Sequence, residues 1–247
     1  MFVAPTSIVR TIWGRADTVL LIFAGAAAEF ALNKSVDWLY FTGRLPKDPL
    51  GRLFSTLTYA QRIVFASEKD ANKAIDSIAG IHKGVEAARG ASIPAEAYLD
   101  VLFMLIGYSI SAFELVDRRL TMREKGEIFD VFYRMGRRMG LEGLPQGYLE
   151  YELARETHLD NRLAKSGYAN DLYRQYRKHL GAARYALLLQ GQALLAPPKV
   201  RELLTLPGRP KLHAVIPVYK LLRRLRLETA IARALLPKPY RDRLPGY

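Results

Sequence analysis

Apolar residues recur at helical spacing along most of the chain. The segments 67–88 and 121–141 open with Ser/Thr-x-x-Asp/Glu capping patterns at Ser67 and Thr121. Their apolar positions then follow a period of about 3.6 residues, which predicts an amphipathic helix in each segment. In the second segment the apolar stripe consists of Ile128, Val131, Phe132, Met135 and Met139.

Three long runs, 18–28, 101–113 and 185–198, carry no charged residue. Each is shorter than the roughly 20 apolar residues that a membrane span needs. The first run follows Arg10 and Arg15, as the apolar part of a signal peptide would, but acidic residues bound it closely on both sides. We therefore predict three buried core helices, no transmembrane segment and a cytoplasmic location.

The remaining pattern is also helical. A long helix is expected over 168–195, between Gly167 and the Pro197-Pro198 pair. No segment alternates with a period of two over a length that would predict a strand. Breaks of the length of helix–helix connections lie at 43–51, 89–94, 142–147 and 206–211. The sequence therefore predicts an all-α fold, a single globular domain of about eight helices.

The amino-acid composition excludes several classes of functional site. Half of the 247 residues are apolar, which is ample for a buried core. The chain has no cysteine, which excludes disulfides, thiolate metal sites, iron–sulfur clusters and cysteine nucleophiles. It also lacks a glycine-rich phosphate loop and the HExxH and GxSxG signatures, so the commonest phosphate-binding, zinc-protease and serine-hydrolase classes are not indicated.

Positive charge is concentrated at the C-terminus. The whole chain has a net charge of +13, and residues 201–247 hold eleven Lys and Arg against three acidic residues, a net charge of +8. In this segment Leu221, Leu222, Leu225 and Ile231 can share one helix face, with Arg223, Arg224 and Arg226 around it. This pattern is typical of a helix lying on an anionic membrane surface. The alternative is a helix docked on the protein with its basic side in water.

A nucleic-acid partner is not expected, because the chain contains no recognised nucleic-acid-binding module and its aromatic residues are interleaved with core positions.

One histidine lies in a distinctive setting. His82 lies at the edge of an apolar helix face formed by Ile78, Ile81 and Val85. Glu86 follows it by one helical turn, and Arg89 by two. Such a histidine is either a structural residue with satisfied hydrogen bonds or a ligand, and the pattern alone leaves both readings open. Upstream, Arg52 and Thr56 are four residues apart and therefore share a helix face.

Several short motifs follow one another in a recognisable order: "DPLGRL..T", "IHKGV", "PAEAYLDVLF" and "LPQGY". In this order the chain resembles the MpaB/latex-clearing-protein (rubber oxygenase) superfamily of helical haem-b proteins. The resemblance extends from about Ile8 to the C-terminal "LLPKPYRDRLPGY". It implies a haem-b-dependent oxygenase that cleaves C=C bonds of a lipophilic substrate with O₂, isoprenoid chains being the substrates of family members.

The resemblance also implies site residues. The family's proximal iron ligand matches His82, which makes it the expected metal ligand. The family's Arg-x-x-x-Thr pair matches Arg52 and Thr56, the expected catalytic and haem-binding partners of His82. One branch of the family has a distal lysine ligand just before this threonine, where the present chain has Ser55.

The chain departs from the family pattern at other positions. An Ala-His-Pro motif common in the family is replaced by Ala31-Leu32-Asn33, and a second histidine by an apolar residue near Met104. Ala87 stands where a glycine is usual. These departures indicate a divergent branch, and they keep two other readings open: a haem-binding protein without turnover, and a non-catalytic peripheral-membrane or complex subunit that retained the fold.

The sequence also predicts a domain organisation and a role for one further acidic residue. Residues 1–200 are expected to form the haem-binding, oxygenase-like domain around a buried haem pocket, with 201–247 packed on it as a basic amphipathic segment. Asp37 lies roughly where one family member keeps an acidic base, and it can equally be a solvated helix residue.

Overall fold

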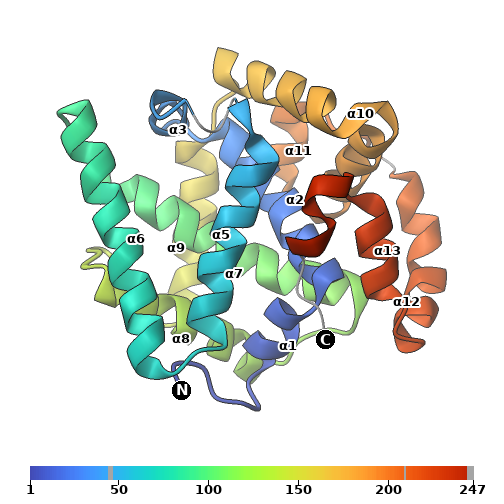
Figure 1. Ribbon diagram of the computed structural model, residues 1–247, viewed down its shortest axis with the longest axis horizontal. Coiled ribbons are helices and arrows are strands. Elements are labelled where there is room, and N and C mark those ends of the chain that lie inside the picture. Colours follow the sequence, from blue (N-terminus) through green and yellow to red (C-terminus); the bar gives the residue numbers. More distant parts are fainter. Residues whose placement is uncertain (44–46, 209, 244–247) are drawn as a thin grey trace.

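The protein folds into an assembly of α-helices (Figure 1). The structure is a computed structural model that describes residues 1–43, 47–208 and 210–243. Over these residues it contains twelve α-helices, two short 3₁₀ helices and no strand, only an isolated bridge between Asn33 and Leu163. The predicted all-α, single-domain fold is confirmed. The count exceeds eight because short helices form at the connections and near both ends of the chain.

The α-helices are α1 (Ile8–Gly14), α2 (Ala16–Leu32), α3 (Asp37–Phe41), α5 (Pro49–Val64), α6 (Glu68–Arg89), α7 (Ala95–Val116), α8 (Met122–Arg138), α9 (Tyr148–Arg162), α10 (Gly167–Leu195), α11 (Pro198–Leu204), α12 (Ile216–Arg224) and α13 (Glu228–Leu235). The 3₁₀ helices are η1 (Lys211–Val215) and η2 (Lys238–Arg243). Parts of the predicted breaks 43–51 and 206–211, and the chain end at 244–247, lie outside the described residues.

The capping patterns form as the sequence predicts. The Ser67 hydroxyl accepts a hydrogen bond from the Asp70 amide at the start of α6, and Thr121 and Glu124 form a reciprocal capping box at the start of α8. The long helix α10 differs from its prediction. Gly181 has a φ of 76° and breaks it into two helical segments, a conformation that glycine adopts without a Cβ clash.

The core is built around α2 and α7, which lie side by side in the middle of the molecule (Figure 1). Helices α10, α11 and α13 also pack against α2. Among the described residues, α7 is the one helix long and apolar enough to cross a membrane, but 67% of its most apolar window is buried inside the protein. It therefore has the burial of a core helix, as its short uncharged run predicts.

A glycine allows α2 and α7 to approach closely. A Cβ atom at Gly25 would lie 2.3 Å from Cδ1 of Tyr108, so the tyrosine ring occupies the space above the α2 backbone. The Tyr108 hydroxyl then donates a hydrogen bond of 3.1 Å to Oε2 of Glu29, one turn further along α2. Glu29 is also held by both terminal nitrogens of Arg155 from α9. This buried polar cluster joins three helices at the centre of the fold.

The C-terminal helices differ from the sequence expectation. Helix α12 contacts α7, and α13 contacts α2. Arg223, expected at a solvated edge, is only 5% exposed, whereas Leu221 and Leu225 are 58% and 63% exposed. This differs from the docked alternative, in which the basic side lies in water: α12 turns Arg223 inward, where it pairs with the buried Asp17 and the half-buried Asp117.

The Gly25→Ala variant is expected to be destabilised by about 1–3 kcal/mol, the usual cost of overpacking a well-filled interior. The added methyl group must push the Tyr108 ring away and weaken its bond to Glu29. Chemical denaturation measures the change in the free energy of unfolding. The matched control is Gly126→Ala in α8, where an added Cβ meets nothing within 4 Å and a gain of up to about 1 kcal/mol is expected from helix propensity. Equal effects of the two substitutions would contradict the close approach of α2 and α7.

Candidate functional site

His82 lies in the half of α6 that the core does not cover. The buried residues of α6 are Ala71, Ala74 and Ile75, all in its first half. In the second half, Ile81 remains 46% exposed although it lies on the apolar face. Of the apolar residues around the histidine, Ile78 packs against the core and Val85 is half-buried, so Ile81 is the one that stays open. That arrangement leaves room for an apolar ligand.

The hydrogen bonding of His82 sets it apart from the other histidines. His158 Nδ1 is bonded to Asp100, and His179 Nδ1 donates to the Gln175 carbonyl at 2.9 Å. His213 is exposed to solvent. His82 Nδ1 is buried and has no hydrogen-bond partner among the residues that the structure describes. Its imidazole is thus not committed to a structural bond, which weighs against the reading of His82 as a satisfied structural histidine.

The surroundings of His82 favour its neutral form. Its pKa is lowered from the ordinary value, mainly by burial and further by the positive charge of Arg52, while Glu86 opposes the shift. A neutral imidazole is the form that binds a metal ion. The ring of Tyr98 packs edge-on against the histidine, with ring centroids 5.1 Å apart. Both side chains line a cavity of 260 Å³ between α6 and the start of α7.

Two polar contacts hold the second half of α6. Glu86 accepts a hydrogen bond of 2.8 Å from the Ile93 amide and a longer one from the Tyr98 hydroxyl. Burial, with a further contribution from Glu86, raises the pKa of Tyr98 to about 12, so this hydroxyl keeps its proton at neutral pH. These contacts tie α6 to the loop and helix that follow it.

Arg89 forms the second attachment, to the short helix α3. Its Nη2 lies 2.6 Å from Oδ2 of Asp37, and its guanidinium stacks 3.9 Å from the centroid of the Trp38 ring. Asp37 is therefore ion-paired and is not a freely solvated residue. Arg89 Nη1 is buried and has no partner among the described residues, so one donor remains for a ligand.

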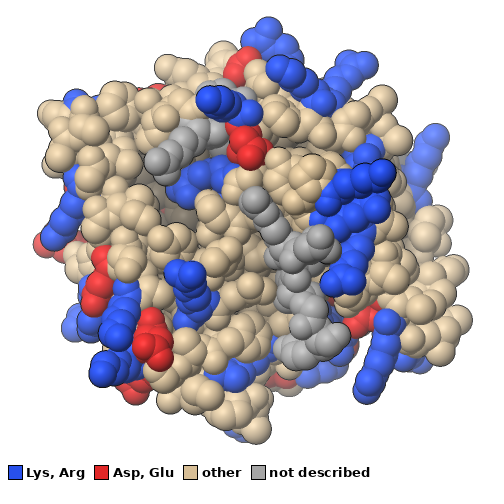
Figure 2. All heavy atoms as spheres, in the orientation of Figure 1, with Lys and Arg blue, Asp and Glu red and all other residues tan. Residues whose placement is uncertain are grey.

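Helix α5 faces α6 across this region. Asp48 caps its first turn by accepting the Gly51 amide at 2.8 Å, which places Arg52 at the helix start. Thr56, one turn later, donates to the Arg52 carbonyl at 3.2 Å. Ser55 Oγ accepts a bond from Arg52 Nη1. Figure 2 shows the surface hollowed between the positions that α5 and α6 have in Figure 1, with Lys or Arg atoms inside the hollow.

The structure thus brings part of the sequence-predicted set together. Arg52 lies close enough to His82 to lower its pKa, from the facing helix α5. Thr56 shares that helix, and neither Arg52 nor Thr56 lines the 260 Å³ cavity beside His82. Tyr98 was not predicted, because its position early in α7 shows no periodic signal. It did place Glu86 and Arg89 on the face of His82, and that spacing was the available clue to their roles.

The donor set fits a haem better than a free metal ion. Among the described residues, no group of three or more His, Asp or Glu side chains could hold a metal ion. A haem needs only one protein ligand to its iron, together with an apolar surface and cations for its propionates. The His82 imidazole, the partly covered apolar face of α6 and the guanidiniums of Arg52 and Arg89 are groups of these kinds.

Comparison with known proteins gives one result. The sequence profile described as "ER-bound oxygenase mpaB/B'/Rubber oxygenase, catalytic domain" matches residues 10–245, which is nearly the whole chain. No curated protein and no solved structure matches the chain significantly.

The Arg52→Gln substitution is expected to raise the pKa of His82 toward its ordinary value in the haem-free protein. The substitution removes a positive charge that disfavours the imidazolium. NMR titration of the His82 Cε1 proton measures the shift.

Two control variants accompany this titration. Arg52→Lys keeps the charge and is expected to keep the pKa low, while Arg62→Gln removes an exposed cation from the far end of α5 and is expected to leave it unchanged. A His82 pKa that is identical in the native protein and in Arg52→Gln would contradict the proximity of the two side chains.

Proposed function

Since the chain belongs to the family of ER-bound oxygenase mpaB/B' and rubber oxygenase catalytic domains, we propose that it is a haem-b-dependent oxygenase of a lipophilic substrate. The proposed reaction is cleavage of a C=C bond by O₂, with isoprenoid chains as the first substrates to test. The observation that carries the proposal is His82, a half-buried imidazole whose Nδ1 has no partner among the described residues, on a helix face that the core covers only in part.

His82 is proposed to be the protein ligand of the haem iron. Burial and the charge of Arg52 keep the imidazole neutral, so that no proton must be displaced before it binds. Glu86 and Tyr98 hold the helix and the ring in place. Ile78, Ile81 and Val85 supply the apolar surface that keeps water away from the ligand.

Arg52 and Thr56 are proposed to act from α5. The planar guanidinium of Arg52 suits a carboxylate of the haem or bound oxygen. The Thr56 hydroxyl, which now donates to the Arg52 carbonyl, provides a second polar group beside it. When bound, haem supplies the site for O₂ and the redox chemistry that these side chains lack.

Two alternative functions follow from the departures from the family pattern. Asn33, where a family histidine motif would stand, donates instead to the buried carboxylate of Asp100 at 2.7 Å. Met104, near the position of the second histidine, is buried in the core. A branch that lost these groups is compatible with haem binding without turnover, or with a non-catalytic peripheral-membrane or complex subunit.

A membrane surface is part of the proposal. A lipophilic substrate partitions into bilayers, and the basic segment 201–247 would hold the enzyme at an anionic surface. The proposed location is the cytoplasmic side of a membrane. Among the described residues, the one helix long and apolar enough to span a membrane is α7, and it is largely buried in the protein.

The absorption spectrum of the purified protein tests the function. We expect a Soret band and a b-type pyridine haemochrome, lost or shifted in His82→Ala because the iron loses its protein ligand. His213→Ala, which changes an exposed histidine, is the matched control and is expected to keep the native spectrum. With a prenyl substrate, O₂ consumption is expected to fall at least about tenfold in Arg52→Ala and Thr56→Ala, as for loss of a polar group acting on the reacting centre.

The outcomes separate the three functions. A coloured protein that consumes no O₂ with any prenyl substrate indicates haem binding without turnover. A protein that stays colourless after haem is added contradicts the oxygenase and leaves the non-catalytic subunit.

A further inference from the structure

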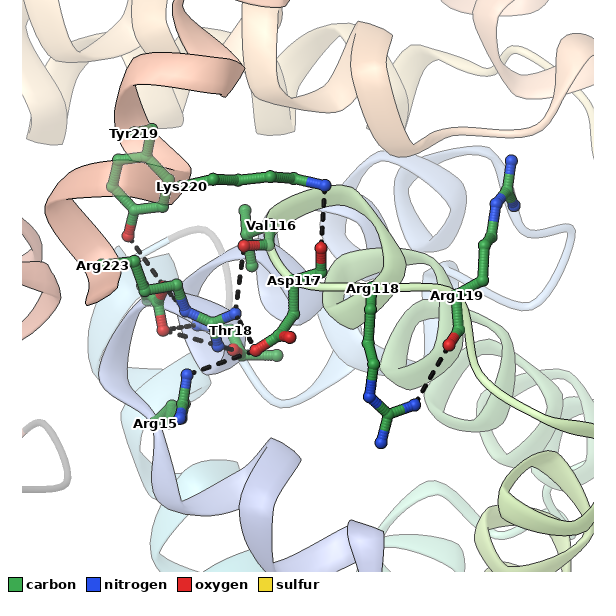
Figure 3. Close-up of polar contacts among 10 residues, drawn as sticks. Arg15, Thr18, Val116, Asp117, Arg118, Arg119, Tyr219, Lys220 and Arg223 are labelled. Carbon is green, nitrogen blue, oxygen red and sulfur yellow. Dashed lines mark hydrogen bonds and ion pairs between the residues drawn. The ribbon is translucent and has the colours of Figure 1, made fainter.

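The rotation of α12 about its axis is fixed by one buried arginine (Figure 3). Arg223 Nη1 donates to Asp117 Oδ2 at 2.7 Å and to the Val116 carbonyl at 3.1 Å. Its Nη2 donates to Thr18 Oγ1 at 3.0 Å, and its Nε lies 2.9 Å from Asp17 Oδ2 as an ion pair without hydrogen-bond alignment. The side chain is only 3% exposed.

Two neighbours of Arg223 strengthen the same attachment. The Tyr219 hydroxyl, one turn earlier on α12, donates to Asp17 Oδ2 at 2.8 Å, and Lys220 Nζ donates to the Asp117 carbonyl at 2.9 Å. All three side chains point toward the start of α2 and the end of α7 (Figure 3). Helix α12 is therefore fixed to the protein by its polar side.

The apolar side of α12 consequently faces solvent. The exposed stripe, called here the leucine stripe, consists of Val218 and Leu221 on α12 and the two residues that flank the helix, Val215 and Leu225; in chain order the four are 49%, 57%, 58% and 63% exposed. Their spacing of three, three and four residues keeps them on one helix face. Leu227 and Leu235 extend the exposed apolar surface onto the turn and helix that follow. A contiguous apolar helix face of this kind marks an interaction surface.

Cations surround the leucine stripe. Within 211–238 the exposed charged residues are Lys211, Arg224, Arg226, Arg233 and Lys238. Glu228 is the only acidic residue in that range, and it is not exposed. Figure 2 shows Lys and Arg side chains over the region of α12 and α13, with uncharged surface between them.

We infer that the leucine stripe inserts into the interface of an anionic lipid bilayer, while the surrounding cations bind the lipid headgroups. The inference rests on the membrane partner of the proposed function and identifies the side chains that make the contact. Charge complementarity favours this occupant, because a bilayer with acidic headgroups offers both an apolar layer and dense negative charge to one helix. Arg223 takes no part in lipid contact; it sets the rotation that presents the stripe.

Co-sedimentation of the full chain with phosphatidylcholine vesicles, with and without phosphatidylserine, tests the inference. The native chain is expected to bind the phosphatidylserine vesicles more tightly, and high salt is expected to weaken binding because it screens exposed charges. The double variant Leu221→Ser/Leu225→Ser is expected to bind at least about tenfold more weakly, since two leucines no longer insert. Arg224→Gln/Arg233→Gln is expected to weaken binding about tenfold through lost headgroup attraction.

The matched control is Leu149→Ser/Leu153→Ser on α9. These leucines are 67% and 68% exposed but lie beside Glu150 and Glu152, so they offer equal apolar area in an acidic setting. Unchanged vesicle binding is expected. Equal losses in the two leucine pairs, or equal binding to vesicles with and without phosphatidylserine, would overturn the inference. So would a native dimer in sedimentation that Leu221→Ser/Leu225→Ser dissociates, because the stripe would then bind a second copy.

The haem spectrum separates this inference from the proposed function. A colourless chain that binds phosphatidylserine vesicles through the leucine stripe supports the membrane contact and contradicts the oxygenase. A haem-loaded chain whose leucine-stripe variant keeps both its Soret band and its vesicle binding supports haem binding and contradicts the membrane contact.

Discussion

Two carboxylates on the central helix α2 lie in the interior, and each requires a cation from a distant part of the chain. Asp17, at the start of the helix, is paired with Arg223 of α12; Glu29, near its end, is held by Arg155 of α9. Leaving either carboxylate buried without its partner costs about 3–5 kcal/mol. These two pairs therefore fix where α9 and α12 lie relative to α2, and through them much of the helix arrangement.

The Glu29 pair also governs the packing of α7. Tyr108 reaches Glu29 because Gly25 leaves space for its ring against the backbone of α2. The hydroxyl of Tyr151 donates to the Phe103 carbonyl from the same side, so α9 is fastened to α7 as well as to α2. Polar side chains therefore join α9 to both α2 and α7, beside a cavity of 340 Å³ that Tyr108, Tyr151 and Arg155 line.

The candidate site lies away from the centre of the fold, beside the second half of α6. Helix α6 is packed on α5 and α8 by its first half, and its second half is held by the polar side chains of Glu86 and Arg89. Polar contacts at a helix end fix its position without filling the space beside it. The histidine-bearing face therefore remains partly open to a ligand, whereas His158 is bonded to Asp100, which Asn33 and Arg162 also contact.

The sequence by itself determined the helical content, because helical period and capping residues act over a few neighbouring positions. It also identified the candidates His82, Arg52 and Thr56 through motif order, and it placed Glu86 and Arg89 on the face of His82. It did not determine that His82 lacks a hydrogen-bond partner while His158 has one, since that depends on Asp100, 58 residues away. Nor did it determine which side of α12 faces inward. Helical periodicity shows which residues share a face, but Asp17, about 200 residues before Arg223, decides where that face points, because a buried carboxylate left without a cation is costly.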